Sequence, residues 1–125
     1  DGVSGLRNLP GRERPIYEHV RKRLTWKNGA RAFAFSAEEP ERLRGPQFEA
    51  AWADEFCIWP RPTQTLANLR LALRRGAHPQ LVVTTTPKPL ASLRALRAEQ
   101  SCVITQAATT INAAHLAPTF LSGLD

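Results

Sequence analysis

The sequence predicts an α/β fold in which parallel strands are joined by crossover helices and preceded by a β-hairpin. In the second half of its 125 residues, β-branched apolar runs alternate with stretches whose leucines recur at helical spacing. In the first half, two short alternating runs flank an Asn-Gly pair, which is a strong local signal for a hairpin. We expect one domain-sized piece, residues 1–125, with a basic segment, hairpin and loop over 1–47 and the strand–helix units over 48–125.

The hairpin is expected from residues 23–27 and 31–35, which lie on either side of Asn28-Gly29. Asn-Gly readily takes the positive φ angles of a two-residue type I′ turn. The charged, Gly- and Pro-containing residues before this hairpin predict a surface segment, and those after it, up to Pro46, predict a loop or a short helix.

Strands and helices are expected to alternate from residue 48 onwards, which places the strands parallel in one sheet. The expected strands are residues 48–53, 81–85 and 103–105. The expected helices run from a Thr63 or Thr65 cap to about residue 75, from 89 to 98, and from 112 to 121.

The composition limits the classes of protein. The formal charge is +6, and Arg makes up 14 of the 17 basic residues. Arginine suits bidentate contact with phosphate, but a GC-rich genome also enriches Arg, Ala and Pro together, so the charge alone favours nucleic-acid binding only slightly. Cys57 and Cys102 stand far apart and the three histidines are scattered, which excludes a zinc site.

Other features of the composition bear on location and completeness. No apolar run approaches the roughly 20 residues of a membrane span, so we expect a soluble protein of the cytoplasm that does not contact a membrane. The chain begins with Asp1 and contains no methionine, so we expect a fragment of a longer protein.

Candidate catalytic residues stand where two of the predicted strands end. Asp54-Glu55 follows the first of them, and Thr84-Thr85-Thr86 ends the second. Carboxyl ends of parallel strands gather functional residues, and an acidic pair there suits nucleotide hydrolysis. One carboxylate then holds magnesium and the other orients or deprotonates the attacking water. A solvated turn is the commoner meaning of such a pair, and both interpretations stay open on the pair alone.

The order of the motifs adds a resemblance. LRGPQFEAAWADE followed by a helix and VVTTTPKP resembles the ATPase domain of large terminase subunits, the DNA-packaging motors of phages, prophages and gene transfer agents. The resemblance runs from the LTWKNGA hairpin to NAAHLAPTFL and implies a P-loop-NTPase-like sheet. It further implies that Asp54 and Glu55 form a Walker B motif, with Asp54 for magnesium and Glu55 as the catalytic carboxylate. Thr85 and Thr86 would form the coupling motif at the nucleotide, and Arg44 would act as an arginine finger toward a neighbouring subunit.

The resemblance also implies a function and partners. The parent protein would hydrolyse ATP with Mg²⁺ to move double-stranded DNA into a procapsid in the bacterial host cell. Its partners would be DNA, other terminase subunits in a ring, the portal protein and the small terminase subunit.

The sequence departs from this family in several places. The run G-x-x-x-x-G-K-[ST] is absent, and the family places this P-loop and its strand upstream of residue 1. The family's nuclease domain would lie beyond residue 125. FCIWPRP replaces the usual leucine and lysine after the acidic pair, and TTINAAH stands where relatives tend to carry an acidic residue. We therefore expect no ATPase activity and no bound cofactor from these 125 residues alone.

The sequence alone leaves several alternatives open. The chain could be an inactive prophage remnant, or a nucleic-acid-binding α/β module without catalysis. Arg44 could be an ordinary surface charge. We expect packing rather than base stacking for Trp26, Trp52 and Trp59, and solvation of a strand edge for the basic residues 21–23.

Overall fold

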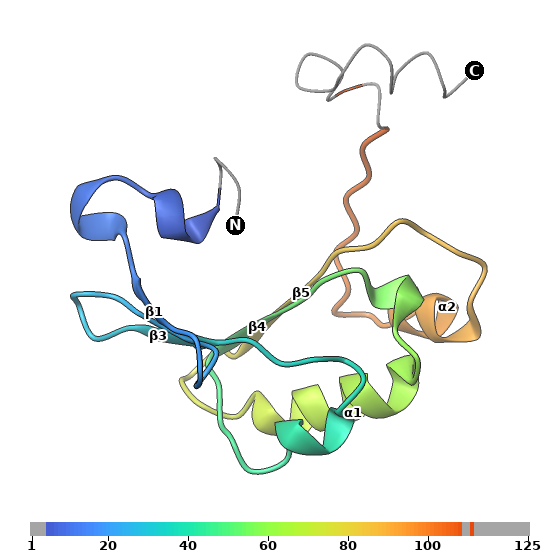
Figure 1. Cartoon of the computed structure of the whole chain (residues 1–125). Helices are drawn as coiled ribbons and strands as arrows, with labels where there is room; N and C mark the ends of the chain where they lie inside the picture. The colour runs from blue at the N-terminus through green and yellow to red at the C-terminus, as the bar shows by residue number, and fades with distance from the viewer. Residues whose placement is uncertain (1–4, 109–110, 112–125) are drawn as a thin grey trace. The chain divides into compact units, whose positions relative to one another are not determined.

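The computed structural model of the chain describes residues 5–108 and residue 111, in two compact units, Asp1–Lys88 and Pro89–Asp125 (Figure 1). The short 3-10 helices of the first unit are η1 (Leu6–Asn8), η2 (Gly11–Glu13), η3 (Pro40–Leu43) and η4 (Phe56–Ile58). Its strands and α-helix are β1 (Ile16–Glu18), β2 (Arg23–Thr25), β3 (Arg31–Phe33), β4 (Ala50–Ala53), β5 (Gln80–Val83) and α1 (Pro62–Ala72). The second unit contains α2 (Ala91–Arg97).

The N-terminal half forms a three-stranded antiparallel sheet in the order β1-β2-β3. The predicted hairpin is confirmed, because β2 and β3 pair antiparallel with Arg23 opposite Phe33 and Thr25 opposite Arg31. Strand β1 was not predicted: it pairs antiparallel with β2, so that Ile16 lies opposite Thr25. Three residues between charged and turn-forming neighbours are too short a run for alternation to reveal a strand.

The turn of the hairpin differs from the predicted type I′ turn. The Gly29 N–H donates to the Trp26 carbonyl (3.0 Å), and the Trp26 N–H donates to the Ala30 carbonyl (2.9 Å), which leaves a three-residue loop between the paired residues. Gly29 has a φ of +86°, whereas Asn28 is not among the described residues with positive φ. Asn28 instead accepts a hydrogen bond from the Ala30 N–H through Oδ1 (3.0 Å). A three-residue loop with glycine in the left-handed position is the usual alternative to a type I′ turn.

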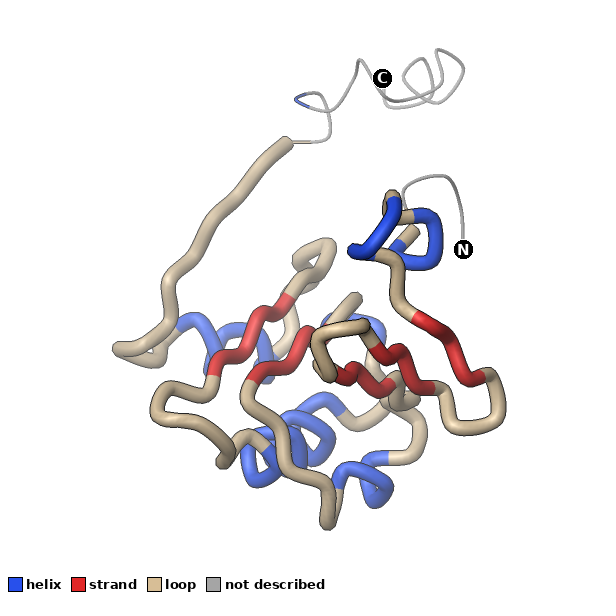
Figure 2. The backbone as a smooth tube through the Cα atoms, turned by 90° about the vertical axis from the view of Figure 1, so that its left-hand side faces the viewer, coloured by secondary structure: helices blue, strands red, loops and turns tan. Residues whose placement is uncertain are grey.

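The second sheet is a parallel pair, β4 with β5, connected by α1. Figures 1 and 2 show α1 on one face of this pair, and in Figure 2 the strands of the two sheets lie next to one another. Ala53 and Leu69 join Leu43 in a buried core cluster between the strands and the helix. On the opposite face Trp52 and Val82 are 67% and 56% exposed. The structure is therefore mixed α/β with a small parallel sheet, and the predicted parallel arrangement is confirmed for these two strands.

Helix α1 starts and ends differently from the prediction. It begins at Pro62, whose fixed φ suits the first helical position, and neither Thr63 nor Thr65 caps it. The buried Thr65 hydroxyl instead donates to the Ala37 carbonyl (3.4 Å). The helix ends at Ala72, because the backbone after it forms a parallel bridge with the segment that precedes β4.

The second unit confirms one predicted element and contradicts another. Helix α2 forms within the predicted range 89–98, with Leu93 and Leu96 buried. The predicted strand at 103–105 is wrong: the segment has no strand pairing, and Val103 is 90% exposed. β-Branched side chains favour strands only where a neighbouring strand and a core face receive them. The predicted helix at 112–121 lies outside the described residues.

Phe56 holds the segment after β4 in the core of the first unit. Its side chain is fully buried and meets Trp59 edge-on, with ring centroids 5.3 Å apart. We expect Phe56→Ala to lower the free energy of unfolding by about 3–5 kcal/mol, because it leaves a cavity. Urea denaturation of the chain measures this. The matched control is Ile58→Ala in the same helix, whose side chain is 61% exposed, and it should change the value by no more than about 0.5 kcal/mol. Equal losses in the two variants would contradict this account of the core.

Candidate active site at the ends of strands 4 and 5

Strands β4 and β5 end side by side, and the polar motifs that follow them meet there. The register pairs Ala53 with the last residue of β5, so that Asp54 and Thr84 come next on the two strands. The Thr84 N–H donates to the Ala53 carbonyl (2.9 Å), and the Phe56 N–H donates to the Thr84 carbonyl (3.2 Å). The backbone therefore fixes the acidic pair and the threonine run at one edge of the parallel sheet.

The Asp54 carboxylate is held by a short chain of hydrogen bonds. The Thr84 hydroxyl donates to Asp54 Oδ1 (2.6 Å), and it accepts a hydrogen bond from the Trp52 indole N–H (2.8 Å). The Trp59 indole N–H donates to the Asp54 backbone carbonyl (2.8 Å). Within the described residues, Asp54 Oδ2 accepts no hydrogen bond, and the side chain is exposed. The carboxylate is thus oriented through one oxygen, which leaves the other accessible.

Glu55 occupies an unusual backbone conformation. It has φ 51° and ψ 44°, in the left-handed region that non-glycine residues rarely adopt. Its carbonyl accepts a hydrogen bond from the Ile58 N–H (3.0 Å), which closes the turn from β4 into η4. Its exposed carboxylate makes no ion pair or hydrogen bond within the described part of the chain. Strained residues of this kind gather at functional sites, where the surrounding structure enforces them.

The three threonines after β5 have different surroundings. Thr84 contacts the Asp54 carboxylate, as described above. The Thr85 hydroxyl accepts a hydrogen bond from the Cys57 N–H (2.9 Å) and donates to the Thr86 carbonyl (3.2 Å). Thr86 is exposed, and its hydroxyl has no hydrogen bond among the described residues. Of the two threonines predicted from sequence, Thr85 is therefore joined to the turn that carries the acidic pair, and Thr86 is not.

Arg44 lies apart from this cluster of residues. It follows η3, its side chain is 64% exposed, and its Nε forms an ion pair with Glu41 Oε2 (3.0 Å). The other oxygen of Glu41 accepts a hydrogen bond from Gln64 Nε2 (3.1 Å). Within the described residues, Arg44 makes no hydrogen bond or ion pair with Asp54 or Glu55. The structure thus places Arg44 on the surface of its own chain.

Trp52 is a site residue that sequence reasoning missed, and Thr84 was predicted only as part of the threonine run, without the contact to Asp54. Both belong to runs identified as strands, but their contact with Asp54 depends on the register between β4 and β5. A shift by one residue would have brought a different threonine to the carboxylate, and no local pattern reports that register.

The oxygen ligands at this edge of the sheet are of the kind that suits a magnesium ion bound at the same time by phosphates. No three His, Cys, Asp or Glu side chains come together anywhere in the described ranges, so a metal cage made by the protein alone is not present there. Magnesium in nucleotide sites usually takes only one or two protein carboxylates and completes its shell with phosphates and water. One oriented carboxylate beside a hydroxyl meets that requirement.

One of three comparisons with known proteins found a match. Comparison with curated proteins found no match, and comparison with solved structures found none either. The helices in the described part of the chain fall short of the length and apolar character needed to cross a bilayer. A family model described as terminase large subunit, T4-like-virus type, N-terminal, matches residues 5–118. The chain therefore belongs to the family of T4-like-virus-type large terminase subunits and corresponds to its N-terminal part.

Proposed function

We propose that this chain is part of an ATP-hydrolysing motor that moves double-stranded DNA into a viral procapsid, and that Asp54, Glu55 and Thr84 belong to its nucleotide site. The 2.6 Å hydrogen bond between Thr84 and Asp54 carries the proposal, because it joins two motifs that lie 30 residues apart. Family membership supports a role in phage DNA packaging. The position of both motifs at the carboxyl ends of parallel strands supports a ligand site there.

Asp54 is the residue that would hold magnesium in this proposal. Its oriented carboxylate leaves one oxygen available, and the Thr84 hydroxyl keeps the group from rotating. The chemistry that bound magnesium would supply here is positive charge beside the phosphates of ATP. Trp52 supports the arrangement indirectly, since its indole N–H fixes the direction in which the Thr84 hydroxyl donates.

Glu55 would act on the attacking water. A carboxylate next to the magnesium ligand can orient that water and accept its proton. The left-handed backbone of Glu55 directs the chain sharply out of β4, which keeps the residue at the exposed end of the sheet rather than in the core. Thr85 would couple changes at the nucleotide site to the turn after Glu55, because its hydroxyl accepts a hydrogen bond from the Cys57 N–H.

The proposed motor needs further parts besides this site. We propose that a P-loop supplied by a longer subunit holds the phosphates, so the 125 residues alone stay without ATPase activity. Arg44 would reach the nucleotide of a neighbouring subunit in a ring. Double-stranded DNA, the portal protein and the small terminase subunit would be the other partners, with assembly in the cytoplasm of the bacterial host.

The test of this function is Asp54→Asn in the full-length motor subunit. We expect steady-state phosphate release to fall at least about 100-fold, because the ion that offsets the phosphate charge loses its protein ligand. Glu49→Gln is the matched control, because this exposed carboxylate precedes β4 and therefore lies at the opposite end of that strand from Asp54. Unchanged phosphate release in Asp54→Asn would exclude this site, and a wild-type subunit that releases no phosphate would favour the alternative, a nucleic-acid-binding module without catalysis.

A further inference from the structure

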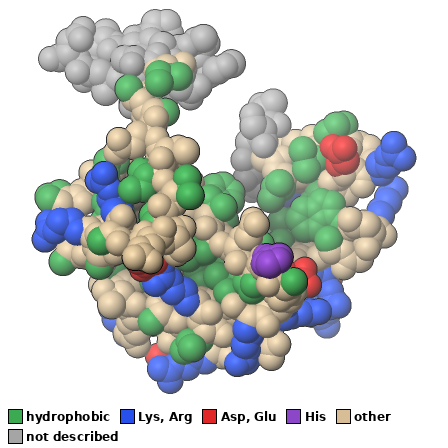
Figure 3. Space-filling view, turned by 180° about the vertical axis from the view of Figure 1, so that it is seen from behind, with side chains coloured by type: hydrophobic (Ala, Val, Ile, Leu, Met, Phe, Trp, Pro, Cys, Tyr) green, Lys and Arg blue, Asp and Glu red, His purple; other side chains and the backbone are tan. Residues whose placement is uncertain are grey.

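Positive charge is concentrated in one part of the first unit. Residues 5–35 contain eight Lys and Arg and two Glu, a net charge of +6 that equals the formal charge of the whole chain. These residues build the sheet β1-β2-β3 and the two 3-10 helices before it. In Figure 3, blue side chains lie along the right-hand edge, over this sheet and these turns, and others lie on the left and along the lower edge. The basic residues are Arg7, Arg12, Arg14, Arg21, Lys22, Arg23, Lys27 and Arg31.

Two of these cations already share one carboxylate partner. Glu18 forms ion pairs with Arg23 (2.6 Å) and Arg21 (3.3 Å). The hydrogen bond from Arg23 is the main reason why the pKa of Glu18 lies below its usual value. Glu18 therefore stays charged at neutral pH and keeps its ion pairs with both arginines, so we do not count these two arginines as available to a ligand.

Four other cations have no such partner. Arg12, Lys22, Lys27 and Arg31 are exposed, and none of them forms an ion pair with another described residue. We call these four residues the basic sheet surface. Three of them come from the hairpin and the turn that leads into it, and Arg12 comes from η2. Exposed cations without carboxylate partners on a paired sheet form a ready site for a polyanion.

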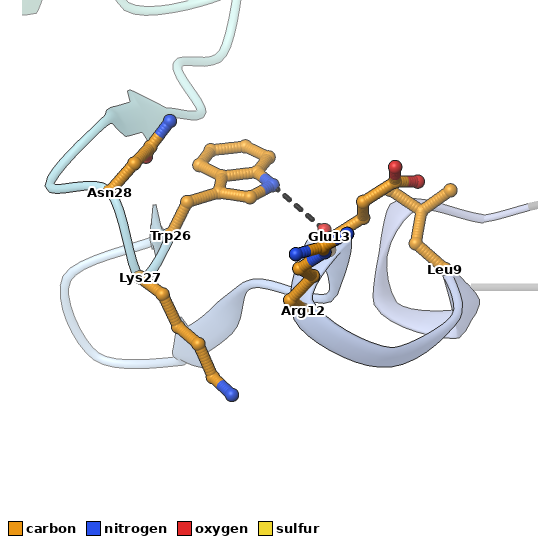
Figure 4. Close-up of a pocket in the computed structure, with 6 residues that line it drawn as sticks. All are labelled: Leu9, Arg12, Glu13, Trp26, Lys27 and Asn28. Atoms are coloured by element: carbon orange, nitrogen blue, oxygen red, sulfur yellow. Dashed lines mark hydrogen bonds between the residues drawn. The ribbon is translucent and has the colours of Figure 1, made fainter.

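Arg12 and Lys27 also border one hollow of about 400 Å³. Figure 4 shows Trp26, Lys27 and Asn28 of the β2–β3 loop on one side of it, and Leu9, Arg12 and Glu13 on the other. The Trp26 indole N–H donates to the Glu13 carbonyl (3.0 Å), so this ring holds η2, which carries Arg12, against the hairpin loop that carries Lys27. A ring used in this way is structural, which favours recognition of phosphates over stacking of bases.

We propose that the basic sheet surface binds the sugar-phosphate backbone of double-stranded DNA, the polyanion that the proposed function provides. Contacts from Lys and Arg to phosphate are independent of sequence, which suits a protein that must handle any stretch of a genome. Arg31 lies in β3, Lys22 and Lys27 lie in the turns on either side of β2, and Arg12 lies in η2. Backbone pairing of the strands and the Trp26 hydrogen bond hold these segments in place, so the backbone has little order to gain on binding. The inference rests on the proposed function only for the identity of the polyanion.

The test measures binding of the chain to duplex DNA of about 30 base pairs by fluorescence anisotropy, from roughly 50 to 200 mM salt and without ATP. Each phosphate contact contributes about 0.9 to the slope of log K against log salt. Arg12→Gln/Lys27→Gln should therefore reduce this slope by about 1.8 and weaken binding at every salt concentration. Lys88→Gln/Arg97→Gln removes the same charge from exposed positions outside residues 5–35 and should leave the slope unchanged.

A second pair of substitutions shows whether the effect of the first pair comes from a folding defect. Lys22→Gln/Arg31→Gln removes the other two cations and should lower the slope by a similar amount, with the urea midpoint unchanged in all variants. The proposal is overturned if wild-type chain does not bind duplex DNA, or if the control pair reduces the slope as much as either test pair. Tighter binding to single strands with quenching of tryptophan fluorescence also overturns it, in favour of base stacking. Since ATP is absent, none of these outcomes depends on the nucleotide site.

Discussion

Replacing Arg44 with alanine in the full-length motor is expected to lower ATP turnover by about 10³-fold or more, while the mutated subunit binds ATP almost as before. An arginine finger acts on the charge that develops in the transition state, and it contributes much less to the bound ground state. Loss of rate with retained affinity is therefore the signature of the role proposed for this residue.

The surroundings of Arg44 make this experiment interpretable. The side chain is largely exposed, and its ion pair with Glu41 lies at the surface, where such pairs add little stability. Arg44→Ala should leave the melting temperature nearly unchanged. Arg42→Ala is a close control, because Arg42 lies in η3, the short helix that Arg44 follows, is 59% exposed and forms an equivalent ion pair with Glu39 (3.1 Å). Turnover, nucleotide affinity and melting temperature should be measured on both variants.

A structural Arg44 predicts a different outcome. If it braces the loop before β4, affinity and melting temperature should fall together with the rate. If Arg42→Ala reduces turnover as strongly as Arg44→Ala, the loss of rate comes from the loss of positive charge at η3, and Arg44 is not a specific arginine finger. Either result would reject the assignment.

Sequence reasoning succeeded where a signal is local. The hairpin was predictable because Asn28-Gly29 and the alternating runs beside it lie within a few residues of one another. Its turn type was not, because Asn-Gly fits both a two-residue loop and a three-residue loop, and here the Asn28 side chain stabilises the latter. Strand β1 has too few residues to show a period.

Pairing across the chain limited the prediction of the sheet and of the site. Segments 81–85 and 103–105 look alike as β-branched runs, yet only the first has a partner strand and a core face. The meeting of the acidic pair with the threonine run followed from the carboxyl-end rule for parallel strands. That Thr84 rather than Thr86 faces Asp54 depends on register, and the left-handed backbone of Glu55 depends on the turn into η4.

Glu55→Gln tests the role of the second carboxylate and is expected to slow hydrolysis by about 10² to 10⁴-fold. Glutamine keeps the size of the side chain but cannot accept a proton. Glutamine, like glutamate, has a Cβ atom, so the strain of the left-handed backbone at this position stays the same. Glycine would relieve that strain and remove the carboxylate at the same time. ATP binding should persist, because the residues proposed to hold magnesium and phosphates are retained.

The most direct test of the central claim, that the edge formed by Asp54, Glu55 and Thr84 is a hydrolytic site, is single-turnover ATP hydrolysis by the full-length Glu55→Gln subunit alongside its equilibrium ATP affinity. Glu49→Gln, an exposed Glu-to-Gln change just before β4, is the control. We expect Glu55→Gln to bind ATP with wild-type affinity and to hydrolyse it at least about 100-fold more slowly, with Glu49→Gln unaffected. Hydrolysis by Glu55→Gln at the wild-type rate would contradict the claim.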